Sequence, residues 1–310
     1  MLIDSPPFPL ELVRDLLAPT GALVEAGPRP WTGDDVIGLL VWDPVSAADF
    51  ERLPALKVIA TCSVGFDHID VAAAAQRGVW VCNVPDYCIE EVADSTIALL
   101  FSLLRGVVAL DRTVRSGGWD DHAAGPLSRI GSTRLGVVGF GRIGRAVAAR
   151  ALALGMDVWA TDPIVDGHEI AAAGVRPATL EEILRSCSAI TLHVPLTRAT
   201  DRLIGERELA LMARGTFLVN TARSGLVDED ALVSALERGQ LGGAAVDVTA
   251  VEPPTAEHPA PRHPRLVVTP HSAWYSPESE REVYRRAALA VRAVIEDGEP
   301  NGAVVRPSGR

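Results

Sequence analysis

The stretch RLGVVGFGRIGRAVAARALALGMDVWATDP, residues 134–163, contains an apolar run, a glycine-rich turn, a helical pattern and a second apolar run that ends at an acid. A strand, a turn, a helix and a strand in this order form the unit that binds dinucleotides in doubly wound α/β domains. Gly139 permits the tight turn, Gly141 lets a diphosphate approach the backbone, and Gly144 lets the helix pack closely on the strand.

The charges of this unit favour NAD as the cofactor. The helix after Gly141 offers free N–H groups and a positive dipole end to the diphosphate, and Arg142 adds a cation. Asp162 falls 21 residues after Gly141, where a carboxylate accepts hydrogen bonds from the ribose diol and repels the 2′-phosphate of NADP. A lone glycine motif is also compatible with a merely tight turn, but the complete unit predicts a coenzyme site.

The rest of the chain repeats the alternation of short apolar runs and helical patterns. This alternation predicts an α/β fold of two doubly wound domains, each a parallel sheet with helices on both faces, and 310 residues suffice for two domains at about 100–200 residues each. The expected strands fall into a first series, 22–27, 36–42, 57–61 and 79–83, and a second series, 134–139, 157–161, 189–193, 216–220, 243–247 and 265–269.

Two long helical patterns lie outside these series. One runs from about Glu90 to Arg115 and would measure about 40 Å as a single helix. The other covers Ser276 to Glu296. Both are compatible with ordinary core packing, or with a pair of helices that joins two lobes.

The composition excludes several classes of protein. The net charge is -11, and Lys57 is the only lysine among 29 basic residues. The chain therefore has no P-loop, and only Lys57 could serve a pyridoxal or Schiff-base enzyme. No basic stripe supports binding of nucleic acid.

The sequence predicts a cytoplasmic protein. The four cysteines form no CxxC pair, which fits a reducing compartment. The N-terminus has no basic region of the kind that opens a secretory signal, and the longest apolar stretch, Thr96 to Leu104, is far shorter than the ~20 residues that span a bilayer. We therefore expect no membrane segment.

Three segments place a polar residue after an expected strand. Arg223 follows 216–220, Asp247 and then Glu252 follow 243–247, and His271 follows 265–269. Ligands of open α/β sheets bind beyond the carboxyl ends of the strands, so these residues should line one crevice with the nicotinamide. Taken singly, each has an ordinary alternative as a surface charge, a loop acid or a histidine with a local partner.

Chemistry gives these residues complementary roles in hydride transfer to a 2-oxo acid. The planar guanidinium of Arg223 can bind the carboxylate and polarise the ketone. His271 can donate the proton, because histidine titrates near neutrality. Glu252 can orient the imidazole from its other nitrogen, and Asp247 is placed to receive the nicotinamide carboxamide.

With these residues in place, the sequence resembles the D-isomer-specific 2-hydroxyacid dehydrogenase family over nearly its full length. The segments that carry the resemblance are SVGFDHID (63–70), NVPDYCIEEVADSTIALLFSLLR (83–105), GFGRIG (139–144), HVPLT (193–197), NTARSGLVDEDAL (220–232), AAVDVTAVEP (244–253) and TPHSAWYS (269–276).

The resemblance implies a Rossmann coenzyme domain, residues 89–282, inserted into a flavodoxin-like substrate domain of residues 1–88 and 283–310. It also implies a homodimer that pairs largely through the coenzyme domains and the long helix. The family's catalytic residues fall on Arg223, Glu252 and His271, and its backbone clamp on the substrate carboxylate falls on Val64 and Gly65. Its coenzyme contacts fall on Arg142, Ile143, Asp162, Val194, Pro195, Thr221, Ala222 and Asp247.

Two subfamilies share features with this chain. SVGFDHID is similar to glyoxylate/hydroxypyruvate reductases, whereas TPHSAWYS is similar to the C-terminal-binding proteins, in which the residue matching Trp274 lines the substrate pocket. Thr61 stands where those proteins place an arginine near the substrate carboxylate. His193 then resembles a strand-end residue near the adenosine, not a catalyst.

Two further groups could suggest metal sites, and we expect no metal at either. His68 with Asp67 and Asp70 lies in the expected substrate clamp, and the run 120–122 (Asp-Asp-His) reads as a solvated loop. The leading hypothesis is thus an NAD-dependent oxidoreductase that interconverts a small 2-oxo acid and its D-2-hydroxy acid. The alternative is an NAD(H)-sensing dimeric binding protein.

Overall fold

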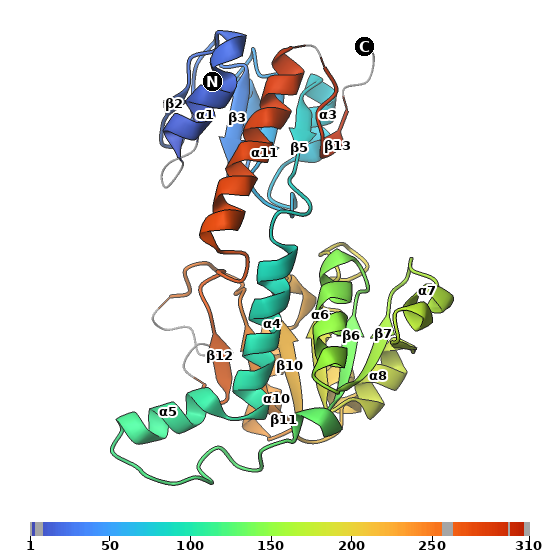
Figure 1. The fold of residues 1–310 in the computed structure, drawn as a ribbon. Coiled ribbons are helices and arrows are strands. Elements are labelled where there is room, and N and C mark those ends of the chain that lie inside the picture. The colour runs from blue at the N-terminus through green and yellow to red at the C-terminus, as the bar shows by residue number, and fades with distance from the viewer. Residues whose placement is uncertain (1, 4–8, 256–262, 297, 307–310) are drawn as a thin grey trace. The chain divides into compact units, whose positions relative to one another are not determined.

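A computed structural model describes residues 2–3, 9–255, 263–296 and 298–306 (Figure 1). The chain forms two compact units, one containing residues up to Tyr87 together with those from Ser276, and the other Cys88–Tyr275. The boundary expected between 282 and 283 would divide one continuous helix, α11 (Pro277–Ile295), so the observed division lies before its N-cap, Ser276. Which unit holds substrate stays a prediction.

The first unit is built on a sheet in the order β13-β5-β4-β3-β1-β2. Without β13 this is the flavodoxin-like order 2-1-3-4-5, and every pairing is parallel except that of β13 with β5. The strands are β1 (Leu2–Ile3), β2 (Glu25–Ala26), β3 (Gly38–Val41), β4 (Val58–Thr61), β5 (Trp80–Cys82) and β13 (Ala303–Val305). β3 and β4 are buried at every position, as expected for strands covered on both faces.

The helices of this unit cover both faces of its sheet. They are α1 (Leu10–Leu17), the short η1 (Ala18–Thr20), α2 (Ala47–Arg52), α3 (Val71–Arg77) and α11. In Figure 1 α11 lies along one face with α1, and α11 makes the contacts to β4 and β3 that bury Val283, Tyr284 and Ala287. The expected helix 276–296 is thus present.

The second unit is built on the parallel sheet β12-β11-β10-β9-β6-β7-β8. Numbered within the unit, this is the order 3-2-1-4-5-6-7 of a Rossmann fold, which reverses direction between β6 and β9. The strands are β6 (Arg134–Val138), β7 (Asp157–Thr161), β8 (Arg176–Pro177), β9 (Ala189–Leu192), β10 (Thr216–Asn220), β11 (Leu241–Val246) and β12 (Leu266–Val268). The predicted fold class, two doubly wound α/β domains, is confirmed.

Helices again cover both faces, with one apolar core on each. They are α4 (Ile89–Leu104), α5 (Val107–Arg115), α6 (Arg142–Ala153), α7 (Gly167–Ala172), α8 (Leu180–Ser186), α9 (Glu206–Leu211) and α10 (Glu229–Glu237), with the short turns η2 (Ile130–Ser132) and η3 (Ser224–Leu226). α4 packs beside α6, and Arg150 of α6 forms ion pairs with Glu90 and Asp94 of α4.

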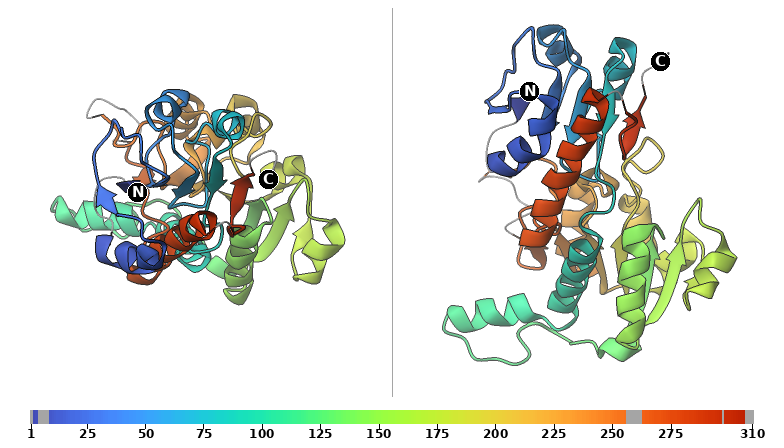
Figure 2. Two further views of the ribbon diagram at one scale, coloured as in Figure 1. Left: turned by 90° about the horizontal axis from the view of Figure 1, so that it is seen from above. Right: turned by 45° about the horizontal axis from the view of Figure 1, so that its top comes forward.

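The long helix expected over 90–115 is wrong as a single element. It ends at Leu104, and α5 leaves at an angle of 60° after Gly106, which has a φ of 62°. A Cβ at Gly106 would lie 2.4 Å from the Cβ of Ala124, so glycine is required at the bend. Figure 2 shows α5 directed away from the sheet of its unit.

No single helix in the described ranges has the length and hydropathy to cross a bilayer, and only the bent pair α4 and α5 passes by length and composition when taken together. The cytoplasmic location stays a prediction.

Candidate active site

The turn after β6 needs glycine at two positions for packing alone. Gly139 has a φ of 99°, and a Cβ there would lie 2.7 Å from the carbonyl carbon of His193. A Cβ on Gly144 would lie 2.0 Å from the carbonyl oxygen of Gly139. The turn can therefore form only if both side chains are absent.

Gly141 has a different environment. It is the N-cap of α6, and a Cβ there would meet no atom of the protein within 4 Å. Packing therefore leaves the space in front of the helix N-terminus open, and a side chain would fill it. Arg142 is exposed at the first position of α6, and Ile143 beside it is half-buried. The first N–H groups of a twelve-residue helix and one cation fit the diphosphate of NAD.

Asp162 lies after β7, close to the same turn. Its Oδ2 accepts a hydrogen bond from the N–H of Phe140 at 2.7 Å, and its Oδ1 accepts from the N–H groups of Ile164 and Val165 at 2.8 and 3.0 Å. Partial burial raises the pKa of this carboxyl, but the three N–H donors and the guanidinium of Arg145 together hold it below its usual value. The group is therefore ionised at neutral pH, so both of its oxygens act only as acceptors.

The predicted catalytic histidine lies in a loop that follows β12. His271 has a φ of 51°, which is uncommon for a residue other than glycine. Its N–H donates to the carbonyl oxygen of Asp247 at 2.8 Å. The carboxylate of Asp247, only 2% exposed, accepts from the hydroxyl of Thr269 and from the N–H groups of Ser272 and Ala273. Asp247 thus holds the loop on both sides of His271.

His271 and Glu252 are paired as predicted from the sequence. The imidazole Nδ1 lies 2.7 Å from Oε2 of Glu252, and the two side chains are 45% and 40% exposed. Glu252 is itself fixed, because its Oε1 accepts from the N–H of Thr249 at 3.1 Å. With Nδ1 directed at the carboxylate, Nε2 is the nitrogen that remains to exchange a proton.

Arg223 lies three residues beyond β10, at the N-cap of η3. Its Nη1 donates to the carbonyl oxygen of Ala222 at 2.8 Å, and its side chain is half-buried. The buried side chain of Asn220 donates to the carbonyl oxygen of Arg223 and accepts from the N–H of Ala222. Since β10, β11 and β12 are neighbours, Arg223, Asp247 and His271 follow the same edge of the sheet.

The remaining predicted coenzyme positions follow β9 and β10. Thr221 is buried and shares a hydrogen bond of 2.9 Å with the hydroxyl of Thr96 on α4. Val194 is buried and Pro195 is exposed just after His193. Desolvation lowers the pKa of the His193 imidazole to about 3, so this histidine is neutral at physiological pH.

Trp274 stands three residues after His271 and donates from its indole nitrogen to the carbonyl oxygen of His271 at 3.0 Å. Its ring meets that of Tyr275 edge to face, with centroids 5.6 Å apart. A hydroxyl of α4, that of Ser95, donates to the carbonyl oxygen of Ala273 and ties this loop to the helix.

The predicted carboxylate clamp, Val64 and Gly65, belongs to the first unit. Both carbonyl oxygens are occupied, that of Val64 by the side-chain amide of Asn83 at 2.6 Å and that of Gly65 by the hydroxyl of Ser63. Within the described ranges, neither N–H group has an acceptor. Two adjacent N–H groups without an acceptor are available to hydrogen-bond an anion such as a carboxylate.

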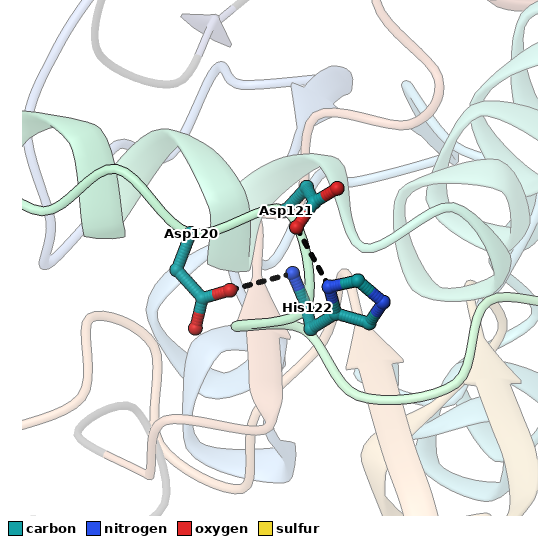
Figure 3. A group of neighbouring side chains, drawn as sticks. All are labelled: Asp120, Asp121 and His122. Atoms are coloured by element: carbon teal, nitrogen blue, oxygen red, sulfur yellow. Dashed lines mark hydrogen bonds and ion pairs between the residues drawn. The ribbon is translucent and has the colours of Figure 1, made fainter.

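The two groups considered as metal sites lie in different settings, and the absence of a metal at either stays a prediction. His68 shares a hydrogen bond of 3.0 Å with Thr61, and Asp70 caps α3 by accepting from the N–H of Ala73. Asp120, Asp121 and His122 have potential ligand atoms within 4.8 Å of one another, all on exposed residues (Figure 3). There His122 bonds through Nδ1 to Asp121 at 2.6 Å, on side chains about nine-tenths exposed, as in a solvated loop.

Sequence reasoning missed the side chains that position the site. Asn220, Asn83, Ser95 and Thr96 touch the segments that carry the predicted residues, yet no spacing rule connects them to those segments. The signal that could have found Asn220 is a buried polar residue at the end of an apolar strand, where an ordinary core residue is expected.

Comparison with known proteins connects this geometry to a family. The sequence model of the D-isomer-specific 2-hydroxyacid dehydrogenase NAD-binding domain matches residues 97–273. The chain belongs to this family. It is an NAD-dependent dehydrogenase, and the resemblance inferred from its motifs is confirmed.

Three individual proteins illustrate the similarity. The chain is 36% identical to a glycerate dehydrogenase of Methylorubrum extorquens over 88% of this chain and 89% of that protein. It is 38% identical to a glyoxylate reductase of Korarchaeum cryptofilum over 91% and 85% of the two chains. The D-lactate dehydrogenase of Aquifex aeolicus, solved with NAD and lactic acid, superposes with a TM-score of 0.89 at 28% identity and covers 99% of both chains.

Proposed function

We propose that this dehydrogenase reduces a small 2-oxo acid of the glyoxylate or hydroxypyruvate type to the corresponding 2-hydroxy acid, of D configuration where that product is chiral. The observation that carries the proposal is the His271–Glu252 pair, whose 2.7 Å contact leaves Nε2 as the proton donor. The names of the glycerate and glyoxylate enzymes at 36% and 38% identity favour the small substrates.

In the proposed mechanism, NADH when bound supplies the hydride, and the residues of the chain supply binding and the proton. Arg223 binds the substrate carboxylate and polarises the carbonyl, because its planar fork matches two oxygens at once. Protonated His271 gives its Nε2 proton to the developing alkoxide, and in the reverse direction takes it back. Glu252 orients the ring and stabilises its charged form.

Further roles are part of the proposal. The free N–H groups of Val64 and Gly65 would bind the substrate carboxylate, and Trp274 would limit the size of the substrate side chain. The coenzyme would be held by Arg142, Ile143 and Asp162 of the turn region and by the set Val194, Pro195, Thr221, Ala222 and Asp247. For Asp247, Oδ1 accepts two hydrogen bonds and Oδ2 one, so Oδ2 retains a lone pair for the carboxamide.

A panel of 2-oxo acids assayed with NADH tests the proposal. The panel contains glyoxylate, hydroxypyruvate, phenylpyruvate and 4-methylthio-2-oxobutyrate. We expect the highest kcat/KM with glyoxylate or hydroxypyruvate. A preference for phenylpyruvate would overturn the substrate assignment. Tight NADH binding without turnover of any acid would instead favour the NAD(H)-sensing binding protein.

We also infer a homodimer. None of the residues of α5 is buried although the helix is amphipathic, and Trp119 in the loop after it is 92% exposed. Exposed apolar residues that cluster in this way are typical of an interface. Sedimentation equilibrium should give twice the chain mass, and Trp119→Asp should weaken the association; a monomer at micromolar concentration would contradict the inference.

A further inference from the structure

Phe140, in the glycine turn, connects the acid of the coenzyme site with a nearby cation. The N–H of Phe140 donates to Asp162 at 2.7 Å. On the other side, the guanidinium carbon of Arg145 lies 4.7 Å from the centroid of the Phe140 ring. Phe140 thus contacts both charged groups: its N–H binds the Asp162 carboxylate, which would face the ribose, and its ring packs against the guanidinium of Arg145. The positive charge of Arg145 acts on this carboxylate.

The guanidinium of Arg145 is held by an acid on another element. Its Nη2 lies 2.6 Å from Oε1 of Glu169 on α7. The side chains of Arg145 and Glu169 are 35% and 59% exposed, so the pair is accessible from solvent. Glu169 therefore forms an ion pair with the Arg145 guanidinium, which would otherwise be available to an anionic ligand beside Asp162.

This arrangement matters for the choice between NAD and NADP. A carboxylate at the position of Asp162 contacts the ribose 2′-hydroxyl and repels a 2′-phosphate. If Asp162 is replaced by a neutral residue, the 2′-phosphate of NADP can take the place of the carboxylate. The positive charge of Arg145, which stabilises the carboxylate, would then stabilise the phosphate. Arginine binds phosphate through charge-assisted, forked hydrogen bonds, but only when its N–H groups are not already taken.

We propose that Glu169 is a second determinant of the preference for NAD. Its ion pair with Arg145 keeps the guanidinium from binding the 2′-phosphate of NADP. Two acids then disfavour NADP in different ways: Asp162 repels the 2′-phosphate directly, and Glu169 neutralises the arginine that would bind it. The proposal depends on the dinucleotide site alone and not on the proposed substrate. A binding experiment therefore tests it separately from the substrate panel.

The experiment measures the dissociation constants of NADPH and NADH by isothermal titration calorimetry. The variants are Asp162→Ser, Glu169→Gln and the two combined. We expect Asp162→Ser to tighten NADPH binding about tenfold, and the added Glu169→Gln to tighten it about another fivefold, since the freed guanidinium gains a phosphate partner. The added change should alter NADH affinity less than about twofold, because NADH has no 2′-phosphate.

Asp111→Asn is the matched control. Asp111 forms an exposed ion pair of 2.7 Å with Arg115 on α5 of the same unit, and its replacement changes the net charge by the same amount. In the Asp162→Ser background, Asp111→Asn should leave NADPH affinity unchanged. An equal gain from Asp111→Asn would show a general charge effect and overturn the proposal.

A third substitution tests whether the gain passes through Arg145. Arg145→Gln, added to the double variant, should remove the fivefold gain, and Arg145→Lys, which keeps the charge without the fork, should retain only part of it. No gain from Glu169→Gln, or a gain that survives Arg145→Gln in a variant with a normal unfolding temperature, would overturn the proposal.

Discussion

The glycine turn of residues 139–144 and the loop of residues 269–275 follow two strands of one sheet, β6 and β12, yet they are held in opposite ways. The turn is held mainly by close backbone packing, of Gly139 against the carbonyl group of His193 after β9 and of Gly144 against that of Gly139. The loop is held by side chains from other elements, namely Asp247 after β11, Glu252 beyond it and Ser95 of α4.

This difference predicts which substitutions should disrupt the turn and which should disrupt the loop. The turn depends on the absence of a side chain at two positions of one short stretch, Gly139 and Gly144. The loop depends on polar groups spread from α4 to the segment after β11: the Asp247 carboxylate accepts three hydrogen bonds, and Glu252 and Ser95 form one each with the loop. Substitutions in the turn should therefore act on coenzyme binding, whereas substitutions around the loop should act on proton transfer.

Gly144→Ala should have the largest effect. The new Cβ would lie 2.0 Å from the carbonyl oxygen of Gly139, so the turn must move and both NADH affinity and the unfolding temperature should fall. Gly141→Ala is the control, because its Cβ meets no protein atom within 4 Å. It should weaken NADH binding at an unchanged unfolding temperature. Equal thermal stability of the two variants would contradict this account of the turn.

His271→Ala should lower kcat by about 10²–10⁴-fold, the usual contribution of a general acid. NADH affinity should change less than about twofold, because the turn is untouched. Stopped-flow single-turnover measurements and calorimetric NADH titration separate the two quantities. A comparable loss of both would remove His271 from its proposed role.

Arg223→Lys should also be severe, with kcat/KM for glyoxylate reduced about a hundredfold, because an ammonium group cannot form the bidentate contact of a guanidinium. The neighbouring main chain should stay in place, since Asn220 holds the carbonyl oxygen of residue 223 and not its side chain. An unchanged kcat/KM would refute the assignment of Arg223 to the substrate.

Asp247→Asn should have a smaller effect, about tenfold on kcat. An amide cannot accept at its nitrogen, so at least one of the three hydrogen bonds from Thr269, Ser272 and Ala273 is lost, at about 1–3 kcal/mol. Thr269→Val is the control that removes only one donor, and should cost less in both kcat and unfolding free energy. If Asp247→Asn weakens NADH binding and leaves kcat intact, Asp247 contributes more to binding the nicotinamide carboxamide than to positioning the loop.

His193→Gln should have the smallest effect. The pKa of His193 is lowered to about 3 by desolvation, so the group is uncharged throughout the range from pH 5 to 9. Its replacement should leave the shape of the pH–kcat profile unchanged. A shifted limb of that profile would show that His193 takes part in proton transfer.

Local signals explain why most of the fold could be predicted. Continuous apolar runs identified the central strands of both sheets, because strands covered on two faces have no polar side to interrupt the pattern. The strands β1, β8 and β13 are two or three residues long and were not predicted, whereas β2, β5 and β12 are as short but lie within longer expected runs, 22–27, 79–83 and 265–269. The bend at Gly106 was missed because the apolar pattern continues across it, while its cause, the packing of Ala124, is eighteen residues away.

The site shows the same limit. The glycines and Asp162 could be predicted from one stretch of sequence, and the His271–Glu252 pair from the chemistry that a 2-oxo acid requires. The contacts that fix them could not, because hydrogen bonds such as that of Ser95 to Ala273 join residues far apart in the chain. Val64 and Gly65 carry no reactive side chain, so their own residues gave no signal, and only the family resemblance indicated them.

Strand β13 has a practical consequence for handling the protein. The N–H of Asn83 donates to the carbonyl oxygen of Gly302 at 2.9 Å, and the side chain of the same Asn83 holds Val64. Asn83 thus links the segment at the start of the last described strand to the main chain of the predicted carboxylate clamp. A truncation that removes β13, or a fusion that displaces it, should disturb a segment more than two hundred residues away in the chain. Kinetic comparisons between preparations should therefore use identical C-termini.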